Sequence, residues 1–93
     1  MVLWPFSLFR VSGDSMLPTY RHGDTLLGLR WFEPHPGQVV VAHNNHRLII
    51  KRVASVQGSL VGLLGDNPKY STDSRSFGAI SRVQVIARII TKL

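Results

Sequence analysis

The chain has 93 residues, no cysteine and a formal net charge of +6. This length suits one domain with a modest core, so we predict a single domain over residues 1–93. The absence of cysteine excludes disulfides, a thiol nucleophile and cysteine metal sites. Basic residues are scattered and never form a run of more than two, so we assign the charge to solubility and predict no nucleic-acid partner.

The N-terminal stretch is apolar from residue 1 to 9, is broken by Pro5 and ends at Arg10. It is far shorter than the roughly 20 residues that cross a bilayer as a helix. It also lacks the preceding positive charge of a secretory signal. Its aromatic side chains, Trp4 among them, allow at most peripheral membrane contact. We therefore expect a cytoplasmic protein without a transmembrane anchor in this chain.

Short apolar runs rich in Val, Ile and Leu alternate with Gly, Pro, Asn and Asp, a pattern typical of strands and turns. We predict strands at residues 8–12, 25–32, 38–43, 46–56, 59–64 and 83–90. The pattern predicts an all-β fold, a small open barrel or sandwich of about six or seven mostly antiparallel strands.

One hairpin is predicted around Asn44 and Asn45, because asparagine tolerates the left-handed conformation that a two-residue turn needs. In this register Gln38 lies opposite Lys51. Two histidines also face each other across the turn. Two histidines without a nearby carboxylate or cysteine make a weak metal site, so we predict no metal.

Ser15 lies in a glycine-containing turn, and Lys51 lies in an apolar strand on the same face as Ile49 and Val53. A serine hydroxyl is a weak nucleophile until a base takes its proton. A lysine can take that proton only when neutral, and burial favours the neutral amine. We predict Ser15 as nucleophile and Lys51 as general base, with no cofactor. The alternative is a turn serine and a strand lysine whose amine reaches solvent.

The loop over residues 65–78 is dense in hydrogen-bonding groups, and loops of this kind often support a site. Asp73 and Arg75 are predicted to pair and to brace the turn. Ser71 is predicted to hydrogen-bond a neutral lysine amine.

Four segments in chain order resemble the type I signal peptidase family of Ser–Lys endopeptidases: residues 12–19, 36–41, 51–53 and 65–78. The resemblance implies an all-β fold with Ser15 as nucleophile and Lys51 as base. It implies that Ser71 orients the lysine and that Asp73 and Arg75 form a structural ion pair beside the site. It also implies a precursor protein as substrate, from which an N-terminal propeptide or signal segment is removed.

Two departures from the family matter. Its oxyanion hole uses the backbone N–H of the nucleophile and a group two residues earlier, often a serine hydroxyl, where this chain has Gly13. Losing one donor can cost about 2.7–4 kcal/mol, so slow turnover is expected. A large β insertion common in the family is replaced here by residues 52–64. In this the chain is most similar to the small, unanchored peptidases that mature nickel-type superoxide dismutase.

Two alternatives stay open. The self-cleaving repressor and mutagenesis-protein family shares the Ser–Lys chemistry and a similar serine turn. It needs a cleavage segment ahead of the serine, yet the 14 residues before Ser15 contain no Ala-Gly or Cys-Gly bond. The other alternative is a catalytically idle β module that binds peptides.

Overall fold

The computed structural model describes residues 2–70 and 74–93. Within them, eight strands form one antiparallel sheet in the order β1-β2-β3-β8-β4-β5-β6-β7. The strands are β1 (Val2–Leu3), β2 (Phe6–Arg10), β3 (Thr25–Leu29), β4 (Val39–Asn44), β5 (Arg47–Gln57), β6 (Leu60–Leu64), β7 (Ile80–Ser81) and β8 (Val85–Lys92). The helical elements are η1 (Pro68–Tyr70), α1 (Ser74–Phe77) and η2 (Arg82–Gln84). The predicted all-β fold is confirmed. No helix in the described residues is long and apolar enough to cross a membrane.

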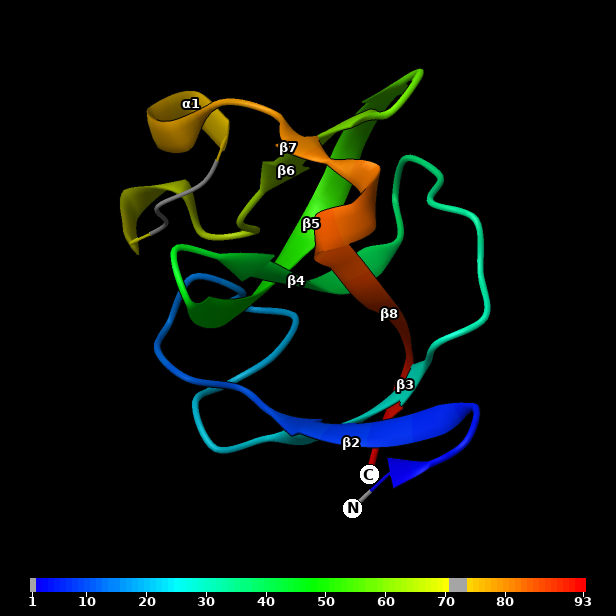
Figure 1. Ribbon diagram of the computed structural model, residues 1–93. Coiled ribbons are helices and arrows are strands. Elements are labelled where there is room, and N and C mark those ends of the chain that lie inside the picture. The colour runs from blue at the N-terminus through cyan, green and yellow to red at the C-terminus, as the bar shows by residue number, and fades with distance from the viewer. Residues whose placement is uncertain (1, 71–73) are drawn as a thin grey trace.

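Strand β8 joins the two parts of the sheet, because it pairs with β3 on one side and with β4 on the other. Both pairings contain a register shift, between Leu27 and Gly28 on β3 and between Val41 and Ala42 on β4. Such irregularities bend a strand and increase its twist. In Figure 1 the sheet accordingly curves from β2 and β3 at the bottom to β5 and β6 at the top.

Strand β4 lies at the centre of the core. Its residues Val39 and Val41 pack in one buried cluster with Met16. The alternate residues Val40 and Ala42 pack in a second cluster, on the other face of the strand. Burial on both faces accounts for the continuous apolar run of this strand, which the neighbouring strands do not share.

The predicted hairpin forms, but its turn lies one residue later than predicted. The turn residues are Asn45 and His46, with φ of 50° and 63°. A turn of this kind needs positive φ at both central positions, and here a histidine takes the second one. As a consequence Val40, not Gln38, lies opposite Lys51.

Candidate active site

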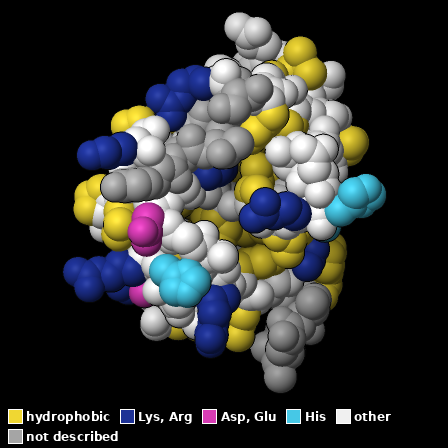
Figure 2. Space-filling model, turned by 90° about the vertical axis from the view of Figure 1, so that its left-hand side faces the viewer, with side chains coloured by type: hydrophobic (Ala, Val, Ile, Leu, Met, Phe, Trp, Pro, Cys, Tyr) yellow, Lys and Arg dark blue, Asp and Glu magenta, His cyan; other side chains and the backbone are white. Residues whose placement is uncertain are grey.

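An open groove of about 690 Å³ lies between the end of β2 and the start of β5. It is lined by residues 8–16, by Val41, Asn44, Asn45 and residues 47–51, and by Phe77 of α1. Figure 2 shows a hollow with hydrophobic side chains on its floor and Lys or Arg side chains around it. The groove therefore brings together the predicted serine turn and the predicted lysine strand.

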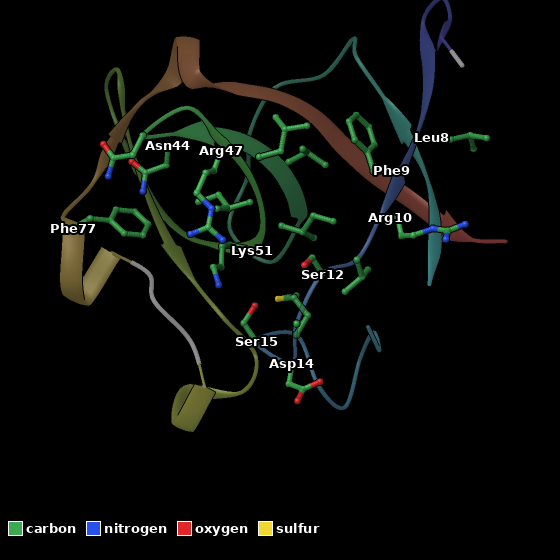
Figure 3. A pocket seen from close by; sticks show the side chains of 18 residues that line it. Leu8, Phe9, Arg10, Ser12, Asp14, Ser15, Asn44, Arg47, Lys51 and Phe77 are labelled. Atoms are coloured by element: carbon green, nitrogen blue, oxygen red, sulfur yellow. The ribbon is translucent and has the colours of Figure 1, made fainter. Parts of the chain in front are cut away.

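Ser15 and Lys51 meet in this groove. The side chain of Ser15 is half-buried, whereas Lys51 on β5 is only 5% exposed. In Figure 3 the Ser15 hydroxyl and the Lys51 amine point toward one another, and the carboxylate of Asp14 points away from both. A hydroxyl directed at a buried amine is the arrangement that a nucleophile and its base require.

The strand neighbours of Lys51 are apolar. Its cross-strand neighbour Val40 is fully buried, and Val53, two residues further along the same face, is 1% exposed. Apolar surroundings disfavour the charged form of a lysine side chain. The position thus suits an amine that has to be neutral in order to accept a proton.

The serine turn is anchored from below by Met16, which is 1% exposed and packs against the core with Val11. Two backbone hydrogen bonds close the turn. The N–H of Leu17 donates to the carbonyl of Asp14 at 3.2 Å, and the N–H of Tyr20 donates to the carbonyl of Met16 at 2.9 Å. The buried methionine and these two hydrogen bonds hold the backbone around Ser15 in place.

The loop after β6 holds the same turn from the side. The N–H of Asn67 donates to the carbonyl of Ser15 at 2.8 Å. The Asn67 side chain donates from Nδ2 to the carbonyl of Asp14 at 3.1 Å. One residue therefore satisfies two carbonyls of the nucleophile turn.

Asp66 connects this turn to the lysine strand. Its carboxylate accepts two bonds from Arg52, at 2.8 Å from Nε and 2.7 Å from Nη2, and a further bond from the Thr19 hydroxyl. The remaining Arg52 nitrogen, Nη1, donates to the carbonyl of Gly37 at 2.7 Å. Thr19 lies four residues after Ser15, and Arg52 directly follows Lys51. The Asp66 carboxylate therefore connects the segment of the nucleophile to the strand of the base. These three residues and Asn67, whose bonds to the serine turn are described above, are together called the clasp: Thr19, Arg52, Asp66 and Asn67.

The ionisation of the clasp follows from its geometry. The hydrogen bonds from Arg52, together with one from Thr19, hold the pKa of Asp66 below its usual value. The same bond to Asp66 raises the pKa of Arg52 above its usual value. Both groups are thus charged near neutral pH, in a two-bonded guanidinium–carboxylate pair.

Gly13 has φ of +83°, a backbone conformation that residues other than glycine rarely adopt. Its N–H donates to Nδ1 of His22 at 2.9 Å, so this N–H is already bonded away from a reacting carbonyl. A Cβ at Gly13 would meet nothing within 4 Å. Of the predicted oxyanion donors, the backbone N–H of Ser15 is the one that the geometry leaves at the nucleophile.

The remaining predicted site residues lie elsewhere. Arg75 is exposed on α1 and lines a second groove together with Arg52 and Asp66, beside the clasp. Ser71 and Asp73 lie outside the described residues, so the Asp73–Arg75 pair stays a prediction. The sequence pattern identified the polar loop over residues 65–78 but assigned no role to Asp66 within it, whose partner Arg52 is 14 residues away.

Comparison with known proteins gives two matches. A family model described as peptidase S24-like matches residues 6–90. The mitochondrial inner membrane protease subunit 1 of Xenopus tropicalis is 31% identical over 109 aligned positions, which cover 88% of this chain. The chain spans 65% of the length of that relative. The two descriptions agree, because one is of a peptidase-like family and the other is of a protease subunit.

Proposed function

Because the chain belongs to the peptidase S24-like family, we propose that it is a Ser–Lys endopeptidase with Ser15 as nucleophile and Lys51 as general base. One observation carries the proposal: the Ser15 hydroxyl points at the amine of Lys51, which is 5% exposed. The alternative of a strand lysine with a solvated amine does not fit this burial.

The proposed reaction has two stages. In the first, Ser15 Oγ attacks the scissile carbonyl while Lys51 Nζ takes the hydroxyl proton, and the N–H of Ser15 donates to the oxyanion. The C–N bond then breaks, and the leaving amine receives the proton from Lys51. In the second stage a water molecule, deprotonated by Lys51, attacks the acyl-enzyme and releases the carboxylic acid and Ser15.

The strands beside the groove suit an extended substrate. Strand β6 pairs with β5 only from Arg52 onward, so residues 47–50 of β5 have no strand partner among the described residues on the side away from β4. Strand β1 pairs with β2 only at Phe6 and Ser7. On that side, the part of β2 near the groove therefore also has no strand partner among the described residues. We propose that a precursor segment binds by adding a strand at these edges.

Ser15→Ala and Lys51→Ala test this function. Each should abolish labelling by an acylating serine probe and cleavage of a precursor, since a nucleophile and its base act as a unit. Lys51→Arg should fail as well, because a guanidinium stays protonated. Circular dichroism checks that each variant is folded. Labelling or cleavage by a folded Ser15→Ala protein would overturn the assignment.

For the substrate we propose the N-terminal propeptide of a nickel-type superoxide dismutase precursor. The supporting feature is the short β5–β6 hairpin between Lys51 and the loop over residues 65–78, where larger signal peptidases have an inserted β region. Incubation of the purified precursor with this chain, followed by mass spectrometry, tests the substrate. The same incubation without precursor tests the self-cleaving alternative, for which the chain itself should shorten.

We further propose a cytoplasmic location with at most peripheral membrane contact. The feature that supports membrane contact is the edge-to-face pair of Trp4 and Trp31, which are 64% and 65% exposed with ring centroids 5.4 Å apart. Exposed tryptophans of this kind favour a membrane interface. Protein released from membranes by a high-salt wash agrees with the proposal, and protein that requires detergent contradicts it.

A further inference from the structure

Arg47 lies at the start of β5, four positions before Lys51. Side chains alternate along a strand, so both residues share one face. Both line the groove, and in Figure 3 the Arg47 side chain extends into it toward Lys51. Arg10 on β2 lines the same groove, but its side chain extends away from Ser15 and Lys51 in the same view.

Basic residues outnumber acidic ones in the lining of the groove. Its charged lining residues are Arg10, Arg47, Lys51 and Asp14, and the Asp14 carboxylate points away from the interior. Within the described residues the Arg47 side chain makes no hydrogen bond or ion pair. Of the other acids that the structure describes, Asp66 pairs with Arg52 and Asp24 with Lys92. The guanidinium of Arg47 is therefore directed into the groove without a partner among the residues that the structure describes.

We propose that Arg47 is a specificity-determining residue that selects substrate segments with an aspartate or glutamate side chain in the groove. This inference rests on the proposed peptidase function. A guanidinium binds a carboxylate through two parallel N–H···O bonds. A glutamine amide or a lysine ammonium group in place of the guanidinium does not offer this geometry. Asn44 lines the same groove, and its side-chain amide supplies a further donor.

The position of Arg47 also resolves a conflict at the base. A lone carboxylate close to Lys51 would favour the ammonium form of the lysine and would oppose its role as base. When the carboxylate is paired with Arg47, the pair adds no net charge beside Lys51. An acidic side chain in the groove therefore leaves the ionisation of Lys51 undisturbed only while Arg47 pairs with that side chain.

The test is cleavage of a peptide library whose members carry Asp, Glu, Asn, Gln or Lys at each varied position. The enzymes are the wild-type chain, Arg47→Gln and the matched control Arg10→Gln, with Ser15→Ala as the blank. The wild type should cleave peptides with an acidic residue at one position about tenfold faster than their amide counterparts, mainly through a lower KM. Arg47→Gln should lose this preference, and Arg10→Gln should keep it.

Two further readouts separate recognition from a general structural effect. Arg47→Glu should reverse the preference toward lysine at the same position. With an acidic peptide, Arg47→Gln should also need a higher pH to reach its maximal rate, whereas an amide peptide should show no such displacement. Thermal melting checks that the exposed substitutions leave the fold intact.

The outcomes distinguish this inference from the function on which it rests. Ser15-dependent cleavage without an acidic preference overturns the inference and leaves the peptidase function standing. A preference that survives Arg47→Gln, or that Arg10→Gln abolishes to the same extent, overturns it as well. If no peptide is cleaved in a Ser15-dependent manner, both the function and the inference fail.

Discussion

The two sides of Ser15 differ in how fully their polar groups are paired. On the clasp side, Asn67 bonds the backbone of the serine turn and Asp66 bonds Arg52 beside the base. On the groove side, the Arg47 side chain has no hydrogen-bond partner in the described residues, and residues 48–50 of β5 have no strand partner there on the side away from β4. The contrast suggests that the reacting groups are positioned before substrate arrives, while the recognition surface is completed by the substrate itself.

The largest effect should come from Met16→Ala, which removes the buried anchor under the serine turn. Met16 is 1% exposed, and truncating a buried methionine costs about 2–5 kcal/mol of stability. Urea unfolding should show this loss, and probe labelling of Ser15 should fall with it. The neighbouring Leu17→Ala is the control, because Leu17 is only partly buried. Equal losses in the two variants would show that Met16 has no special role.

A smaller effect is expected for Asp66→Asn, which keeps the shape of the clasp but removes its charge. The loss should be about 1–2 kcal/mol, since charge-assisted bonds are broken but the Arg52 side chain is 36% exposed and solvent screens the pair. Activity should fall further than stability alone explains, because the turn and the base strand lose their common tie.

The exposed Glu33 provides the control for Asp66. Glu33→Gln should change the free energy of unfolding by less than about 0.5 kcal/mol, as is usual for surface substitutions. If Asp66→Asn retains full kcat/KM at a temperature where it is folded, the clasp does not position the reacting groups.

The pH dependence of stability should reveal the same carboxylate. Its pKa is lowered in the folded state by Arg52, so the stabilisation is complete above the unfolded value of about 3.9 and is lost as the pH falls through the lower folded value. Urea unfolding between about pH 5 and pH 2 should therefore show a decline in wild type that is shallower in Asp66→Asn. Parallel declines would show that the Asp66–Arg52 pair does not cause the loss of stability in acid.

Sequence analysis predicted the six longer strands, because apolar runs between turn residues are a local signal. It missed β1 and β7, which at two residues each are too short to show periodicity. It placed the hairpin turn one residue too early, since asparagine preference alone does not reveal that His46 adopts positive φ. The link from Asp66 to Arg52 was missed because it depends on how β5 and β6 pair, which brings together residues 14 positions apart.

The smallest effect is expected at His22, the histidine that binds the serine turn through the N–H of Gly13. The acylation rate of wild type should rise with pH through an ionisation below that of a free lysine, about 10.4, if buried Lys51 is the base. His22→Phe removes an exposed acceptor, a change worth about 0.5–1.5 kcal/mol, so the rate should stay within roughly tenfold of wild type.

The pH at which the acylation rate rises, the rising limb of the pH–rate profile, decides whether Lys51 or His22 is the base. It should be unchanged in His22→Phe and in variants of the other histidines, His35, His43 and His46, whereas Lys51→Ala should abolish both the rate and the limb. Stopped-flow labelling with an acylating probe from pH 5 to pH 10 measures this. A limb near 6.5 that disappears with His22 would make that histidine the base. In that case the buried amine of Lys51 would be structural, and the groove would work by serine–histidine chemistry instead.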